Sequence, residues 1–445
     1  MTASKRRAIR TDGGADDEPW RVGTATRVIT PEAPMWMAGY GRRDHVSEGV
    51  DEDLHARAVA IEDEVGTRVV VVSVEVLGFT PDLRAALEDA CADSYDLAPD
   101  RLLLNASHTH NGPEYRPDAY GILEAGEGHD ERAREYRDRL ERELIEAVGE
   151  ALEDRSSAAL RYNHTTCGIA MNRRLPTEDR IRFKPYSDGA VDHDVPVLVA
   201  TSGGEVTALL FGYACHPTSL PHTYRYHGDW AGLAMANLEE CYDTTAAFVQ
   251  GCGGDIKAYP QREVEYTEQH GRTLATAVEA AVVSRGKTVH GPLRTVQTEV
   301  TLEFEEPPSR EELDDRVADG DDRHAQRLLD ELDREGRIQT EFPYPVQAIG
   351  FGNDLTLLGL AGEVLADYSL SIKDRLEGDV WVAGYSNEGY LYVPARRHVY
   401  EGGYEAGWVS LYWDYPMPPK PTVEDVVTGT ALSLAERVGA RRTDH

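Results

Sequence analysis

Two histidines in the segment 107–113, His108 and His110, are the first residues that could do chemistry. They follow the apolar run Arg101–Ala106, whose pattern predicts a buried strand. In extended backbone, side chains two residues apart point to the same side, and imidazole nitrogen is a common zinc ligand. A His-x-His pair is equally compatible with two histidines that hydrogen-bond to loop carbonyls. It therefore predicts a metal site only together with further ligands.

Two further candidate ligands also stand at the ends of strand-like runs. His216 follows Thr207–Tyr213, and Glu363 follows Phe351–Leu360. A buried carboxylate needs a cation or hydrogen bonds, so Glu363 fits a metal site. The alternatives are a core histidine bonded to backbone and a carboxylate at a helix N-terminus. We interpret Cys215 as a small buried hydrophobe, because its side chain should point away from that of His216.

A glycine-rich turn, 251–255, follows the strand-like run Ala246–Gln250. Glycines let backbone approach a substrate closely and present N–H groups to it, so the turn is a candidate substrate contact. A plain tight turn is the alternative. The segment is not a phosphate-binding P-loop, because the required lysine and hydroxyl residue do not follow at the right spacing.

The elements that must position these residues alternate between strand-like and helix-like patterns. Arg68–Val76 predicts a strand buried on both faces. Thr80 and Pro81 predict the start of a helix whose apolar residues recur every four positions, at Leu83, Leu87 and Cys91. A longer helix is predicted by a second such stripe, formed by Tyr136, Leu140, Leu144, Val148 and Leu152.

The second half of the chain continues in the same style. Glu268–Ser284 predicts a helix, Val380–Tyr385 a strand, and Pro307–Arg337 a charged helical excursion. No fixed-period repeat or Pro/Ser-rich linker divides the chain. We therefore expect an α/β fold with one large catalytic domain over residues 20–440, mixed β-sheets flanked by helices, and a metal site at the carboxyl ends of strands. Residues 1–19 are expected to form a flexible tail.

The charge of the chain is strongly negative. Of its 445 residues, 79 are acidic and 46 basic, which gives a formal net charge of −33. An acidic surface with little lysine predicts adaptation to high salt, where the Debye length shrinks to roughly 3 Å at 1 M; an ordinary acidic protein is the alternative. The field disfavours nucleic acid and favours a cationic or neutral small substrate. Lysine occurs only at positions 5, 184, 257, 287, 373 and 420.

Location and redox state follow from what the sequence contains. The first twenty residues have no apolar segment typical of a secretory signal, and no run of eighteen apolar residues predicts a membrane span. The 5 cysteines form no CxxC pair. We expect them to be reduced and mostly buried, and the protein to be cytoplasmic.

Taken in order, the motifs resemble the N-terminal catalytic domain of the neutral, non-lysosomal ceramidases and their shorter prokaryotic relatives. The resemblance covers roughly residues 20–420. It rests on the segments Gly39-Tyr40-Gly41, Leu54-His55-Ala56-Arg57-Ala58, 108–113, Met171-Asn172-Arg173, His216-Pro217-Thr218-Ser219, Gly254-Asp255, Gly362-Glu363, Ser386-Asn387 and Tyr404-Glu405-Ala406.

The resemblance implies one zinc ion per chain. Its ligands would be His108, His216, Glu363 and a tyrosine, which falls on Tyr392 with Tyr390 as the alternative. His110 and Asp255 match residues of the catalytic group, and Arg173 and Tyr404 match residues that contact substrate.

Two departures from the family pattern stand out. The family's proposed nucleophilic serine follows a Gly-Asp-Val motif, whereas here Gly254-Asp255-Ile256 is followed by Lys257. The C-terminal immunoglobulin-like domain of the longer relatives is also not expected in this sequence. We predict a zinc-dependent hydrolase of amide bonds in N-acylated small molecules or lipids, using zinc-activated water. A zinc-dependent esterase or lactonase, or an inactive ligand-binding relative, are the alternatives, and an oligomer is possible.

Overall fold

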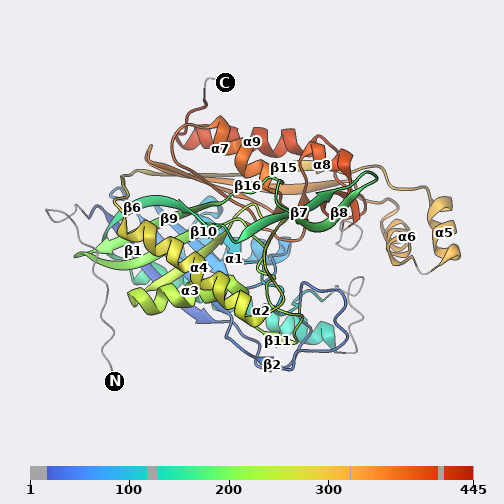
Figure 1. Ribbon diagram of the computed structural model, residues 1–445, viewed down its shortest axis with the longest axis horizontal. Coiled ribbons are helices and arrows are strands. Elements are labelled where there is room, and N and C mark those ends of the chain that lie inside the picture. Colours follow the sequence, from blue (N-terminus) through green and yellow to red (C-terminus); the bar gives the residue numbers. More distant parts are fainter. Residues whose placement is uncertain (1–17, 118–127, 321, 409–414, 444–445) are drawn as a thin grey trace.

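The computed structural model describes residues 18–117, 128–320, 322–408 and 415–443 (Figure 1). The tail expected at residues 1–19 lies almost entirely outside these ranges. Within them, the chain forms two β-sheets that pack face to face, with helices on both outer faces (Figure 1). The predicted α/β fold with mixed sheets is therefore confirmed.

The larger sheet has 9 strands in the order β12-β10-β9-β6-β1-β3-β4-β5, with β14 beside β6. The pairs β4/β5 and β10/β12 are parallel, and the other pairs are antiparallel. The strands are β1 (Trp20–Val28), β3 (His55–Glu62), β4 (Arg68–Val74), β5 (Leu102–Ala106), β6 (Ser156–Thr166), β9 (Asp194–Ser202), β10 (Glu205–Tyr213), β12 (Thr245–Gln250) and β14 (Lys287–Val289).

The second sheet has 4 strands in the order β15-β16-β17-β19. They are β15 (Leu293–Glu303), β16 (Glu341–Phe351), β17 (Leu355–Leu360) and β19 (Val380–Ala383). One core cluster joins the sheets, with Val69 and Val71 on the larger sheet and Ile349, Leu357 and Trp381 on the smaller. Because side chains alternate across a strand, the intervening valines of β4 face the opposite side, toward the helices.

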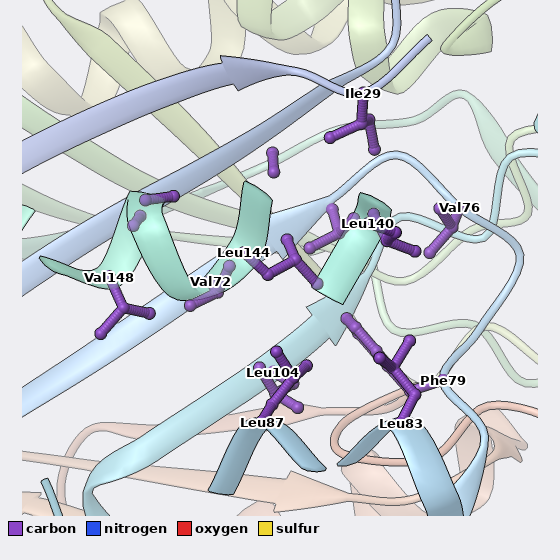
Figure 2. Packing of buried hydrophobic residues seen from close by; sticks show 14 of the residues in the cluster. Ile29, Val72, Val76, Phe79, Leu83, Leu87, Leu104, Leu140, Leu144 and Val148 are labelled. Carbon is purple, nitrogen blue, oxygen red and sulfur yellow. The ribbon is translucent and has the colours of Figure 1, made fainter. Parts of the chain in front are cut away.

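The outer face of the larger sheet is covered by helices with apolar stripes. Helix α1 (Pro81–Tyr95) and helix α2 (His129–Glu153) pack on β3–β5, where Leu83, Leu140 and Leu144 meet Val72 and Leu104 (Figure 2). Helices α3 (Asp229–Tyr242) and α4 (Val264–Val283) cover the β9–β12 side. Helices α7 (Ala366–Arg375) and α9 (Val423–Val438) cover the smaller sheet. The result is a four-layer α/β/β/α arrangement.

Several sequence predictions are confirmed in detail. Thr80 caps α1 by accepting a hydrogen bond from the Leu83 backbone N–H, and the apolar stripe of α2 is buried throughout. The cysteines of the described residues are free thiols, and Cys215 is buried in the core as expected. None of the helices in the described ranges is long and apolar enough to cross a bilayer.

The charged helical excursion predicted over residues 307–337 is confirmed. It consists of two helices, α5 (Arg310–Asp319) and α6 (Arg323–Glu335), which pack on each other at one end of the molecule (Figure 1). One strand prediction needs correction. Residues 351–360 are not one strand, because a turn at 352–354 separates β16 from β17.

Smaller sheets complete the region near the strand ends. They are β13-β7-β8, formed by β7 (Ala170–Pro176), β8 (Ile181–Tyr186) and β13 (Ile256–Ala258), then β18 (Glu363–Val364) with β20 (Tyr392–Val393), and β2 (Gly49–Val50) with β11 (Arg225–Tyr226). A short helix α8 (Arg396–Glu401) and a helical turn at Tyr404–Trp408 follow β20.

Candidate metal centre

Four candidate ligands meet where the parallel strands end. His108 follows β5, His216 follows β10, and Glu363 follows β17. Glu363 and Tyr392 are directly opposite each other in the parallel pair β18/β20. Side chains that enter from separate strand ends of both sheets thus converge on one point, where rigid elements hold them.

The imidazole rings are oriented by backbone carbonyls. His108 Nδ1 lies 2.6 Å from Leu77 O, and His216 Nδ1 lies 2.7 Å from Gly253 O. A ring nitrogen next to a carbonyl oxygen must carry a proton, so the neutral tautomer of each ring has its lone pair on Nε2. Both Nε2 atoms therefore face the centre as metal-binding atoms, and the backbone carbonyls hold the rings in that orientation.

The spacing of the donor atoms fits a small tetrahedral cation. Glu363 Oε2 lies 3.3 Å from His108 Nε2 and 3.0 Å from His216 Nε2. Tyr392 Oη lies 3.5 Å from His216 Nε2. Zinc bonds of 2.0–2.1 Å in tetrahedral geometry place neighbouring donors roughly 3.3 Å apart. The residues present therefore fit a zinc ion.

The two candidate tyrosines differ in their surroundings. The Tyr392 hydroxyl faces His216, whereas the ring of Tyr390 lies under the Arg116 guanidinium, 4.1 Å from its central carbon. The geometry favours Tyr392 over Tyr390 as the tyrosine ligand.

His110 lies beside the same centre but is more exposed than the other two histidines. Its Nε2 is 3.1 Å from His108 Nε2, and the ligand atoms of His108, His110 and His216 all lie within 4.8 Å of one another. The expected extended backbone is wrong, because His108 has a φ of 66°. The rings of His108 and His110 are brought together by this left-handed turn of the backbone.

The electrostatics favour a cation at this point. Burial and then the charge of Arg173 lower the pKa of His216 to about 3, so its imidazole is neutral and able to bind metal. Burial opposes ionisation of Glu363, but His108 and His216 outweigh it and hold the pKa of that carboxyl well below its usual range. Burial also lowers the pKa of His110, followed by the effect of the other two histidines.

Arg173 connects the centre to a buried ion-pair network. Its guanidinium donates to the Tyr392 hydroxyl at 3.0 Å and to Glu405 Oε1 at 2.8 Å. Glu405 also accepts a bond of 2.7 Å from Arg174 Nη1. Arg173 is only 1% exposed. It therefore positions Tyr392, and the more exposed residues around it are the ones that a substrate can reach.

Those neighbours form an aromatic rim. Tyr404, which is 40% exposed, lies 4.9 Å from the Phe183 ring, and both rings flank the Arg173 guanidinium. The Tyr40 ring lies 5.0 Å from His110 on the other side. The substrate contacts predicted for Tyr404 and Arg173 stay predictions: Tyr404 is exposed at this rim, and Arg173 is buried behind it.

Asp255 lies behind the centre. One carboxylate oxygen accepts from the Asn172 amide at 2.8 Å and the other from the Ala366 backbone N–H at 3.0 Å. Burial raises its pKa to about 6. These contacts tie β7 to the start of α7, and none of them reaches a candidate ligand. The predicted catalytic place of Asp255 stays a prediction, and its geometry is that of a positioning residue.

The glycine turn packs directly against the segments that carry two of the candidate ligands. A Cβ on Gly254 would lie 2.5 Å from Glu363 O, and one on Gly253 would lie 2.7 Å from Cys215 N. Both residues are buried. The glycines are required for close packing against the strands that carry His216 and Glu363, and the expected backbone contact with substrate is not supported by this packing.

Lys257 lies beside the aromatic rim and not on the open surface. It is half-buried, and its ammonium lies over the Phe183 ring, 5.1 Å from the centroid. Burial, followed by the charges of Arg173 and Arg262, lowers its pKa to about 7. No local pattern could predict this, because Phe183 lies on a distant strand.

Other residues at the site were not assigned roles from sequence. Tyr385 has a left-handed backbone, with a φ of 49°. Its ring lies 4.5 Å from the His108 ring. The sequence indicated Glu405 only as part of the motif Tyr404-Glu405-Ala406. Its place among aromatic and small residues was the one sign of its role, because a carboxylate buried in such a segment needs a partner.

Known proteins share this arrangement of elements. The structure of neutral ceramidase from Pseudomonas aeruginosa has a TM-score of 0.74 with this chain at 20% identity, over 97% of this chain and 76% of that one. A ceramidase complexed with C2 has a TM-score of 0.73 at 17% identity, over 95% and 76% of the two chains. At these identities the likeness shows the fold.

Sequence relatives point the same way. Neutral ceramidase of Mycobacterium tuberculosis is 25% identical over 301 residues, which is 56% of this chain and 44% of that protein. Neutral ceramidase A of Dictyostelium discoideum is 24% identical over 260 residues, 56% of this chain and 35% of that protein. The chain thus spans less than half the length of either relative.

The family model described as neutral/alkaline non-lysosomal ceramidase, N-terminal, matches residues 20–290, well over half of the chain. The resemblance found in the sequence is thereby confirmed. The chain belongs to the neutral/alkaline non-lysosomal ceramidase family.

Proposed function

We propose that the chain is a zinc-dependent amidohydrolase that cleaves the amide bond of N-acylated small molecules or lipids. The observation that carries this proposal is the convergence of His108, His216, Glu363 and Tyr392 with donor spacings of 3.0–3.5 Å. Family membership supports it, because the named relatives are ceramidases, and ceramide is an N-acylated lipid.

The four ligands would hold one zinc ion. When bound, zinc would lower the pKa of a water to about 7 and polarise the substrate carbonyl. Carbonyl anchoring of the His108 and His216 rings directs their Nε2 atoms toward the metal position. Arg173 holds the Tyr392 hydroxyl in place.

His110 is the residue best placed to act on the substrate. It is partly buried beside the buried ligands, and its lowered pKa keeps the ring neutral at pH 7. A neutral imidazole can donate a hydrogen bond to a developing oxyanion or move a proton to the leaving amine. Its neighbour Tyr40 packs against the ring and limits its motion.

Lys257 supports direct attack by water over a covalent route. It occupies the position where the family pattern has a serine. An acyl group on a lysine amine would be an amide, as resistant to hydrolysis as the substrate. A lysine therefore cannot replace serine as a nucleophile that turns over.

The test is turnover of matched amide and ester substrates by zinc-loaded protein. We expect amide hydrolysis with amine and acid released in equal amounts and no acyl adduct on the protein by mass spectrometry. Hydrolysis of the ester alone would make the protein an esterase. A burst of amine with a labelled side chain would show a covalent route.

A further inference from the structure

One cation near the metal centre has no counter-ion. The Lys257 ammonium makes no ion pair and no hydrogen bond within the described part of the chain, and its contact is the face of the Phe183 ring. A half-buried ammonium loses hydration, so a site that holds one without an acid favours an anion from outside.

The absence of a partner is unusual for this chain, which has 79 acidic residues against 46 basic ones. Among the other lysines of the described ranges, Lys287 pairs with Asp354, Lys373 pairs with Asp192 and Lys420 pairs with Glu303. Only Lys184, which is exposed on β8, resembles Lys257 in having no acid among the described residues. Acids are abundant, yet none of the described ones is placed against Lys257.

The carboxylate with the strongest electrostatic effect on Lys257 is that of Asp229, and it is already bound to backbone N–H groups. Asp229 accepts hydrogen bonds from the backbone N–H groups of Ser219, Leu220 and Trp230 and is fully buried. Its charge is therefore neutralised locally by N–H dipoles at the start of α3. It cannot serve as the counter-ion that Lys257 lacks.

Two further cations act on Lys257. They are Arg173 and Arg262, whose charges lie close enough to repel the ammonium. Arg173 is neutralised by Glu405, whereas Arg262 is exposed and its guanidinium makes no ion pair with any described acid. Lys257 and Arg262 thus form a local positive region on a protein of net charge −33, and such a region attracts an anionic group of a substrate.

The position of Lys257 ties this region to the reacting centre. Its backbone forms a parallel bridge with His216 on one side, and β13 pairs with β7, which carries Arg173, on the other. An anion held by Lys257 therefore lies close to the metal ligands. An amino-acid carboxylate has this placement in an N-acyl amino acid, where it is two bonds from the amide nitrogen.

We propose that Lys257, assisted by Arg262, binds a carboxylate of the substrate, so that N-acyl amino acids are preferred over neutral N-acyl amines. The inference rests on the proposed amidase function for the identity of the substrate but not for the binding of the anion. Binding and hydrolysis are therefore measured separately.

The binding experiment compares N-octanoylglycine with N-octanoylglycinamide, which differs only by replacing the carboxylate with a neutral amide. Isothermal titration is carried out on zinc-loaded and zinc-free protein, at a salt concentration that keeps it folded. We expect the acid to bind at least about tenfold more tightly in both forms, a difference of about 1.4 kcal/mol.

Variants assign the preference to Lys257. Lys257→Met should reduce it to within about twofold, Lys257→Arg should retain most of it, and Arg262→Gln should reduce it partly. Lys184→Met is the matched control, because this exposed lysine on β8 points away from Phe183 and should change nothing. Melting curves identify any variant that fails to fold, and Lys257→Arg keeps the test valid in that case.

Three results would overturn the inference. The first is equal binding of both compounds to the wild type, and the second is an undiminished preference in Lys257→Met. The third is a preference that disappears on zinc removal, which would make the carboxylate a metal ligand. If the preference holds but zinc-loaded protein cleaves neither compound, the amidase proposal fails and the anion site stands. If the neutral amide is cleaved and no preference exists, the amidase proposal stands alone.

Discussion

Glu405 is the residue whose removal should most clearly show the cost of the buried network behind the metal centre. Its carboxylate is 1% exposed and bridges two guanidinium groups, with bonds of 2.8 Å from Arg173 Nε and 2.7 Å from Arg174 Nη1. Both arginines are also buried. Glu405→Ala therefore leaves two buried cations short of their shared counter-ion.

The magnitude follows from these contacts. Two charge-assisted hydrogen bonds at about 1.5–3 kcal/mol each give about 3–6 kcal/mol, and breaking a buried ion pair by removing one partner typically costs about 3–5 kcal/mol. We expect Glu405→Ala to lower the free energy of unfolding by about 3–5 kcal/mol. Because Arg173 also holds the Tyr392 hydroxyl at 3.0 Å, zinc affinity should fall about 10- to 100-fold.

Urea unfolding followed by tryptophan fluorescence measures the first effect, and competition with a zinc chelator measures the second. Glu401→Ala is the matched control, since Glu401 also pairs with Arg174, at 3.2 Å, but is 36% exposed. A partly exposed pair contributes less than about 1 kcal/mol. Equal losses in the two variants would refute the reasoning that burial makes the Glu405 network strong.

Three other predictions concern pH, salt and His110. Burial raises the pKa of Glu388 from its usual 4.5 to about 7, so the stability that its protonated form contributes is present below about pH 4.5 and is lost as the pH rises through 7. Relative to Glu388→Gln, the wild type should therefore lose about 3 kcal/mol of unfolding free energy over that window. Parallel pH curves for the two proteins would contradict this. Because the chain has a net charge of −33, its melting temperature should rise steeply from dilute buffer to about 2 M potassium chloride. A variant with ten surface acids changed to Asn or Gln should respond much less. A flat wild-type curve would refute the high-salt prediction. His110→Ala should keep bound zinc but lose about 10²- to 10⁴-fold in kcat, whereas loss of the metal would make His110 a ligand.

The sequence predicted those elements whose patterns are local. The run Arg68–Val76 has the continuous β-branched character of a strand buried on both faces, and β4 is such a strand. The Thr80 cap and the four-residue spacing behind it were sufficient for α1. Strand β15 was missed because one side of it is polar, so it forms no continuous apolar run.

The candidate ligands could be named from their positions at strand ends and from family resemblance, but their arrangement could not. Tyr390 and Tyr392 are both compatible with the sequence, and only the pairing of β20 with Glu363 distinguishes them. The left-handed backbone of His108 and the burial of Lys257 under Phe183 also depend on contacts between distant segments. Sequence patterns carry no information about such contacts.

The central claim is that His108, His216, Glu363 and Tyr392 form one zinc site on which hydrolysis depends. The most direct test is metal content by mass spectrometry together with amide turnover, for wild type, His108→Ala and His216→Ala, before and after exhaustive chelation. The wild type should contain close to one zinc per chain, both variants should be empty, and activity should vanish on chelation and return with zinc. Full activity in the metal-free protein, or one tightly bound zinc in either variant, would contradict the claim.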